Sequence, residues 1–226
     1  MENFLIITID GPAGSGKSSV AVKLADRLGI AYLDTGAMYR AVTVAALEQH
    51  VPLDDEGALA EMVGRCEIEI AYGEGICHIL LDGRDITDKI RRPEVTEEAH
   101  HLAKAAAVRA QLVRQQQQIG EKLGSLVTEG RDQGTVVFPE ASFKFYLDAA
   151  PESRARRRQE QLQQQGVEME YQEILDSQKQ RDQRDSSRAA GPLKPADDAI
   201  IIDTTDMSLE EVVETLYQYV QEKKKR

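Results

Sequence analysis

A glycine-rich segment near the start of the chain carries the clearest chemical signature. Residues 11–18 read GPAGSGKS and match the pattern G-x-x-x-x-G-K-[ST] at every fixed position. Glycines in such a loop let backbone N–H groups turn inward around phosphate oxygens. Lys17 can reach the β- and γ-phosphates, and Ser18 can ligate Mg²⁺. We therefore expect ATP and Mg²⁺ here. The predicted contacts are Gly11, Pro12, Ala13, Gly14, Ser15, Gly16, Lys17, Ser18 and Ser19.

The segments on both sides of this loop have the pattern that a phosphate-binding loop requires. Residues 4–9 form an apolar, β-branched run typical of a buried strand. Residues 18–28 have apolar side chains at helical spacing, and Gly29 follows where a C-cap glycine would stand. A helix that begins at the loop adds its dipole to anion binding. The alternative, a glycine-rich turn that only connects a strand to a helix, is less consistent with this context.

Three arginines late in the chain share one face of a predicted helix. Arg154, Arg157 and Arg158 stand at i, i+3 and i+4. Like charges on one face repel each other, so the face favours a bound anion. A lid that closes over ATP would bring one and would exclude water. The alternative is a solvated basic face that Glu152 and Glu160 partly neutralise.

A second charged stripe follows at helical spacing. Arg181, Arg184, Asp185 and Arg188 stand at i, i+3, i+4 and i+7. Three arginines around one aspartate leave excess positive charge, which predicts a phosphate site. The alternative is an ordinary surface ion pair between Arg181 and Asp185, worth under about 1 kcal/mol.

Gly130, Arg131 and Asp132 follow a predicted strand, at the end where a parallel sheet places ligand contacts. The planar guanidinium of Arg131 suits phosphate oxygens. Asp132 can accept a hydrogen bond from an exocyclic amine such as that of cytosine. The alternative is a strand-end turn with a local ion pair.

Composition excludes several classes of protein. The 226 residues have a formal net charge of −11, so a nucleic-acid partner is not expected. No apolar run approaches the length of a membrane span, and the first residues do not resemble a signal peptide. A cytoplasmic protein is therefore expected. A guanine-reading N-K-x-D motif cannot exist because Asn3 is the only asparagine, which argues against a GTPase switch.

The remaining pattern predicts an α/β fold. Strand and helix signals alternate along the chain, which indicates a parallel sheet with helices on both faces. Residues 51–94 depart from this rhythm and predict an inserted antiparallel subdomain. Residues 96–118 predict one long helix. Ser208 and Glu211 form a capping box before the last helix.

Four separated motifs, in this order, make the chain resemble bacterial cytidylate kinases. The resemblance runs from about Ile6 to the last helix. The motifs are IDGPAGSGKSS at 9–19, LDTGAMYR at 33–40, EGRDQGTVVFP at 129–139 and RDQRDSSR at 181–188.

The resemblance implies a P-loop three-layer fold with a five-stranded parallel sheet, an antiparallel monophosphate-binding subdomain and a helical lid. Residues 1–34 and 120–226 would form the core, with the lid within about 151–190, and residues 35–119 would form the monophosphate-binding region. The implied reaction is ATP + CMP or dCMP giving ADP + CDP or dCDP, in pyrimidine metabolism. The expected partners are these small molecules, and a monomer is expected.

The same resemblance implies roles for individual residues. Lys17, Arg131 and the lid arginines 154, 157 and 158 would be catalytic. The acceptor would be bound by Thr35, Arg40, His100, Arg109, Arg131, Asp132, Arg181, Asp185 and Arg188. His100 and Ala106 stand where the family usually has a serine and a proline, and the serine normally helps to read cytosine. Another P-loop kinase, acting on AMP, UMP or a hydroxyl such as that of shikimate, is the nearest alternative.

Overall fold

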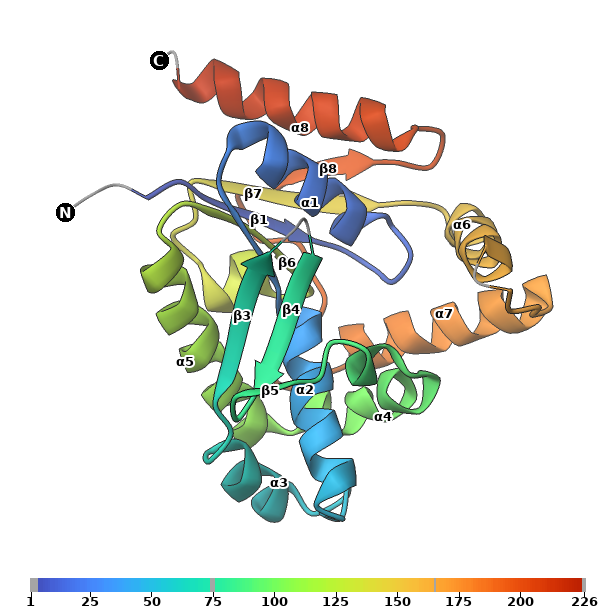
Figure 1. Cartoon of the computed structure of the whole chain (residues 1–226). Helices are drawn as coiled ribbons and strands as arrows, with labels where there is room; N and C mark the ends of the chain where they lie inside the picture. The colour runs from blue at the N-terminus through green and yellow to red at the C-terminus, as the bar shows by residue number, and fades with distance from the viewer. Residues whose placement is uncertain (1–3, 74–75, 165, 225–226) are drawn as a thin grey trace. The chain divides into compact units, whose positions relative to one another are not determined.

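The computed structural model describes residues 4–73, 76–164 and 166–224 (Figure 1). Backbone contacts divide the chain into two compact units. The first unit is Met1–Tyr32 with Leu123–Arg226, and the second is Leu33–Lys122. Among the described residues, we find no helix with the length and apolar character needed to cross a membrane.

A five-stranded sheet organises the first unit. Its strand order is β2-β6-β1-β7-β8, and β1 pairs in parallel with both β6 and β7. The expected five-stranded parallel sheet is therefore confirmed. The strands are β1 (Ile6–Asp10), β2 (Ala31–Asp34), β6 (Leu126–Gly130), β7 (Phe143–Asp148) and β8 (Ile200–Asp203).

Helices and one π-helical turn complete the first unit. The parallel pairing brings the carboxyl ends of β1 and β6 to one edge of the sheet, with Asp10 opposite Gly130. The phosphate loop and the segment after β6 therefore start side by side. The other elements are α1 (Lys17–Leu28), the turn η2 (Gln133–Val137), α6 (Pro151–Gln164), α7 (Tyr171–Ser186) and α8 (Leu209–Lys224).

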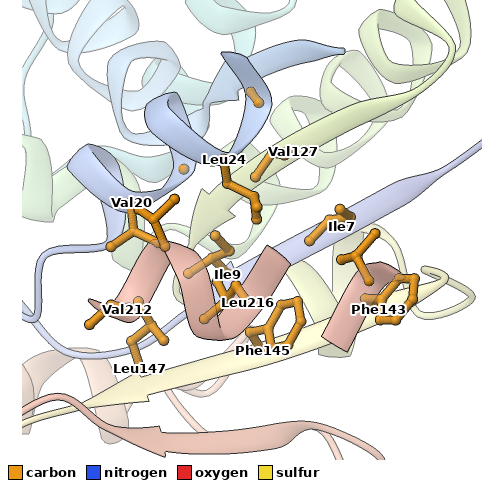
Figure 2. Close-up of a cluster of buried hydrophobic side chains, with 14 of the residues drawn as sticks. Ile7, Ile9, Val20, Leu24, Val127, Phe143, Phe145, Leu147, Val212 and Leu216 are labelled. Atoms are coloured by element: carbon orange, nitrogen blue, oxygen red, sulfur yellow. The ribbon is translucent and has the colours of Figure 1, made fainter. Parts of the chain in front are cut away.

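One hydrophobic core holds α1 and α8 against the sheet (Figure 2). Leu24 of α1, Leu216 of α8 and Ile9 of β1 are all fully buried. Burying an aliphatic side chain of this size contributes about 1.5–3 kcal/mol. The capping box before α8 is confirmed, because Ser208 N donates to Glu211 Oε2 at 2.8 Å and Glu211 N donates to Ser208 Oγ at 3.3 Å.

The second unit contains helices and the small antiparallel sheet that the sequence predicted. The sheet order is β3-β4-β5, with antiparallel pairing throughout. The elements are α2 (Thr35–Glu48), α3 (Glu56–Val63), β3 (Ile68–Gly73), β4 (Ile76–Leu81), β5 (Arg84–Asp85), the short 3₁₀ helix η1 (Lys89–Arg91), α4 (Pro93–Lys104) and α5 (Ala106–Leu123).

The prediction of one long helix over residues 96–118 is wrong. Ala105 has extended backbone angles, φ −70° and ψ 111°, and separates α4 from α5. Side chains replace the helix hydrogen bonds at the break: Glu56 Oε1 accepts the N–H of Ala107 at 2.8 Å, and Arg109 Nη1 donates to Ala103 O at 3.3 Å. In a continuous helix the N–H of Ala107 would pair with the carbonyl oxygen of Ala103, and at the break each of these groups has a side-chain partner instead. An alanine-rich sequence gives no local sign of this.

Candidate active site

The phosphate loop has the backbone geometry that its glycines allow. Gly14 has φ 77° and Gly16 has φ 89°, backbone angles that residues with a Cβ rarely adopt. Helix α1 begins at Lys17, one residue before the predicted start, and its N-cap residue is Gly16, which has no side chain to cover the first N–H groups of the helix. The helix start is thus arranged to receive an anion from outside the chain. Ser15 is buried and donates its hydroxyl to Pro12 O at 3.1 Å.

Lys17 is folded back on the loop and is only 5% exposed. Its ammonium group donates to Pro12 O at 2.6 Å and to Ser15 Oγ at 3.4 Å. Burial lowers the pKa of Lys17 to about 7, and the neighbouring Arg131 charge lowers it as well. Glu129 raises it in part. A buried cation in positive surroundings gains stability when a polyanion arrives.

Ser18 lies beside a carboxylate that the sequence did not single out for the site. Its hydroxyl donates to Glu129 Oε1 at 2.8 Å, and Glu129, near the end of β6, is 6% exposed. A hydroxyl and a carboxylate are oxygen ligands of the kind that Mg²⁺ takes. No group of three or more His, Cys, Asp or Glu that could hold a metal exists among the described residues. The two side chains therefore fit an ion that takes further ligands from phosphate and water.

Asp185 on α7 is the centre of an arginine cluster. Arg131 Nε donates to its Oδ2 at 2.8 Å, and Arg188 Nη2 donates to its Oδ1. Burial raises the pKa of Asp185, but the two guanidinium groups more than offset this and hold the pKa below its ordinary value. The stripe on this helix predicted Arg181, Arg184 and Arg188 around Asp185. Arg188 is hydrogen-bonded to Asp185, but the second partner is Arg131 from the end of β6 and not Arg184, which donates to Gln180.

Arg181 and Arg184 of the same stripe are exposed, whereas Asp132 is buried. Arg181 is exposed, and its charge acts on both Lys17 and Asp185. Arg184 is also exposed and donates to Gln180 on its own helix at 3.3 Å. Asp132, which follows Arg131, is 4% exposed. Arg131, Asp132, Asp185 and Arg188 thus gather where the carboxyl end of β6 meets α7.

Arg154 on α6 and Asp182 on α7 together hold one peptide of the phosphate loop. Arg154 Nη1 donates to Ala13 O at 2.8 Å and pairs with Asp182 Oδ2 at 2.6 Å. Asp182 Oδ1 accepts the N–H of Ala13 at 3.1 Å. Both polar groups of the Ala13 backbone are therefore held by a single ion pair. Asp182 was not among the predicted site residues, although it lies in the RDQRDSSR motif.

The three predicted lid arginines contact three different parts of the first unit. Arg154 is 4% exposed and engages Ala13. Arg157 donates to the carbonyl oxygen of Thr204, and to that of Met207 at 3.3 Å, in the segment before α8. Arg158 donates to Gln161 Oε1 on its own helix at 2.7 Å. The helical spacing is as predicted, and a role at the donor phosphates stays a prediction for all three.

Four predicted acceptor residues lie in the second unit, and two of them are at the start of α2. Thr35 is the first residue of that helix and is buried. Asp34 caps the helix by accepting the N–H of Ala37 at 2.9 Å, and its other oxygen pairs with Arg40 Nη2 at 3.0 Å. The guanidinium of Arg40 is thereby oriented by the cap of its own helix.

The other two predicted acceptor residues of the second unit are Arg109 on α5 and His100 on α4. Arg109 is 3% exposed, and its guanidinium carbon lies 5.7 Å from the ring centroid of Tyr39, within cation–π range. His100 Nδ1 lies 2.7 Å from the carbonyl oxygen of Glu97 in the same helix. That contact leaves the second ring nitrogen of His100 as its other hydrogen-bonding atom.

Comparison with known proteins gives a consistent result. The family model described as cytidylate kinase matches residues 7–222. A cytidylate kinase of Pasteurella multocida is 44% identical over 222 residues, which cover 98% of this chain and 97% of that protein. A cytidylate kinase of Bacillus subtilis is 43% identical over 223 residues, 99% of each chain. An uncharacterized protein from Eubacterium ventriosum has a similar fold, with a TM-score of 0.52, 15% identity and coverage of 97% and 99%.

Proposed function

Because this chain belongs to the cytidylate kinase family, we propose that it transfers the γ-phosphoryl group of ATP to CMP or dCMP, giving ADP and CDP or dCDP. The observation that carries the proposal is the match to that family over residues 7–222. The phosphate loop and the arginine cluster support it, since phosphoryl transfer depends on alignment and positive charge.

The donor phosphates bind at the phosphate loop and the start of α1. Lys17 exchanges its hydrogen bond to Pro12 O for the β- and γ-phosphates, and the N–H groups around Gly14 and Gly16 face the phosphate oxygens. Arg154, Arg157 and Arg158 complete the donor side as the lid closes. Closure removes water, which strengthens each of these charge interactions.

Ser18 and Glu129 are the residues that would hold Mg²⁺, because their oxygens already lie 2.8 Å apart. The ion supplies charge neutralisation at the phosphates when it is bound. Glu129 also orients the Ser18 hydroxyl by accepting its hydrogen bond.

The acceptor binds at the carboxyl end of β6 and at α7. Arg131, Arg181 and Arg188 hold the CMP phosphate, while Asp132 and Asp185 contact the base and sugar. Thr35, Arg40, His100 and Arg109 contribute from the second unit. An oxygen of the CMP phosphate attacks the γ-phosphorus in line. The acceptor is already an anion, so no general base is required.

An ADP-release assay with ATP and Mg²⁺ tests the substrate assignment. CMP, dCMP, UMP and AMP are compared in parallel, and CMP and dCMP are expected to give the highest turnover. Lys17→Ala should abolish turnover with every acceptor. Preference for UMP or AMP would contradict the proposal and would direct attention to the helix around His100.

A matched pair of arginine variants tests the acceptor site. Arg131→Ala should lower kcat/KM for CMP by at least about tenfold, since a hydrogen bond to a charged group contributes about 1.5–3 kcal/mol. ATP binding should be unchanged. Arg184→Ala removes an exposed arginine that donates to Gln180 on its own helix, and this variant should behave as wild type. Equal losses in the two variants would refute the acceptor role of Arg131.

The proposal includes a monomer that works in the cytoplasm, with ATP and CMP or dCMP as its partners. The formal net charge of −11 supports the absence of a nucleic-acid partner. Sedimentation of the purified protein measures the oligomeric state directly, and a concentration-independent dimer would contradict this part.

A further inference from the structure

A buried carboxylate at the end of β1 caps a turn far away in the sequence. Asp10 is 4% exposed and stands immediately before Gly11 of the phosphate loop. It accepts the N–H groups of Gln133 at 2.9 Å and Gly134 at 2.8 Å. These residues begin the π-helical turn η2, whose own N-cap residue, Asp132, makes no side-chain cap hydrogen bond. The turn is therefore capped by a residue 123 positions earlier.

Asp10 also lies beside the residue that precedes Arg131. In the register of β1 and β6, Asp10 is paired with Gly130. Only Arg131 and Asp132 lie between that pairing and the capped N–H of Gln133. Both ends of this two-residue segment are thus attached to one residue of β1. Any displacement of the Asp10 carboxylate should move Arg131 and Asp132 relative to the phosphate loop.

Opposing effects on the pKa of Asp10 leave this carboxylate close to half-ionised near neutral pH. Burial raises the pKa of Asp10 to about 7, and the two backbone N–H groups oppose that rise. The facing groups are Asp132, which raises the pKa, Lys17, which lowers it, and Tyr146 of β7, whose own pKa of about 12 keeps it neutral. Above the pKa, the ionised group accepts both hydrogen bonds. Below it, the carboxyl O–H faces an N–H and one of the two bonds is weakened.

We infer that Asp10 is a positioning residue for phosphoryl transfer, and that its carboxylate fixes the Arg131–Asp132 segment beside the phosphate loop so that the segment can receive the CMP phosphate and base. The inference rests on the proposed function, in which Arg131 and Asp132 bind the acceptor. Asp10 is itself buried and acts through the hydrogen bonds that it accepts from Gln133 and Gly134.

Steady-state kinetics of Asp10→Asn test the inference. The amide has the same shape but offers one acceptor oxygen, and its NH₂ opposes the second N–H. KM for CMP should rise about tenfold, the effect of losing one charge-assisted hydrogen bond, while KM for ATP stays unchanged. Thr128→Val is the matched control, because it removes a neutral hydrogen bond of 3.0 Å to Gln133 in the same turn.

The pH profile separates positioning from a general structural role. Between about pH 8 and about pH 6, KM for CMP should rise more steeply in wild type and in Thr128→Val than in Asp10→Asn, because Asp10→Asn removes the titrating carboxylate. Lys17, whose pKa is also about 7, is common to all three proteins. The titration of CMP itself is common to all three proteins. Parallel profiles in all three, or equal changes in KM for ATP and CMP, would overturn the inference.

Amide hydrogen exchange gives a readout that needs no substrate and no variant. In wild type, exchange at Gln133 and Gly134, corrected for the intrinsic pH dependence, should accelerate below about pH 7 as the Asp10 carboxylate is protonated. If wild type fails to phosphorylate CMP, the proposed function fails, and this exchange still decides whether Asp10 holds the turn. If the exchange rates of these two amides, corrected in the same way, stay constant across this range, the proposed dependence of the turn on the Asp10 carboxylate is refuted.

Discussion

Two glycines of the phosphate loop, Gly14 and Gly16, should respond very differently to the same substitution. Both have left-handed backbone angles, φ 77° and φ 89°, so an alanine at either position costs about 1–2 kcal/mol in backbone strain. A Cβ on Gly16 would meet nothing within 4 Å. A Cβ on Gly14 would lie 2.7 Å from Gln178 Nε2 and 3.3 Å from Arg154 Cβ.

The difference between the two variants isolates the packing of α6 and α7 on the loop. Overpacking of this kind costs about 1–3 kcal/mol. Gly16→Ala should therefore lower the free energy of unfolding by about 1–2 kcal/mol, and Gly14→Ala by about 2–5 kcal/mol. Urea unfolding, with the midpoint and slope fitted for each variant, measures both values.

A third substitution shows whether Gln178 is the cause. Gln178→Ala removes the nearest atom and should restore about 1 kcal/mol or more in the Gly14→Ala background, a coupling typical of residues in contact. The same change should restore nothing in the Gly16→Ala background. Equal losses from the two glycine variants, or no rescue by Gln178→Ala, would refute the reasoning that these helices pack directly on the phosphate loop.

Two further predictions concern the helix break and Lys17. Ala106→Pro should stabilise the protein by about 0.4–1 kcal/mol, since Ala105 already has ψ 111° and proline suits a first helical position. Ala107→Pro should destabilise it by removing the N–H that Glu56 accepts at 2.8 Å; urea unfolding compares the two, and equal effects would contradict the assignment of the break. Because the pKa of Lys17 is lowered to about 7 and phosphates raise it, ATP binding near pH 8 should take up as much as ~0.9 proton. Calorimetry in buffers of different ionisation enthalpy measures this uptake, which should vanish in Lys17→Met.

Local sequence signals predicted the elements that depend on near neighbours. The strand–loop–helix around Gly14 was predictable because glycine positions and apolar spacing both lie within one segment. The capping box before α8 was predictable for the same reason, since the hydrogen bonds between Ser208 and Glu211 join residues three positions apart.

Features that depend on distant partners were not predictable in this way. The Ser18 hydroxyl meets Glu129 across 111 positions, and Ala13 meets Asp182 across 169. Neither pair has a spacing that one sequence can reveal. The break at Ala105 is similar, because Glu56 accepts a bond from the start of α5 across 51 positions.

The central position of β1 has a consequence for synthesis of the chain. Both neighbours of β1 in the sheet, β6 and β7, belong to the part of the first unit that begins at Leu123. Leu5 and Ser125, which are hydrogen-bonded at the edge of this pairing, are 120 positions apart. At translation rates of about 5–20 residues per second, β1 waits roughly 6–24 s for its first neighbour. During that time the nascent chain exposes an apolar strand that a ribosome-bound chaperone is well placed to cover.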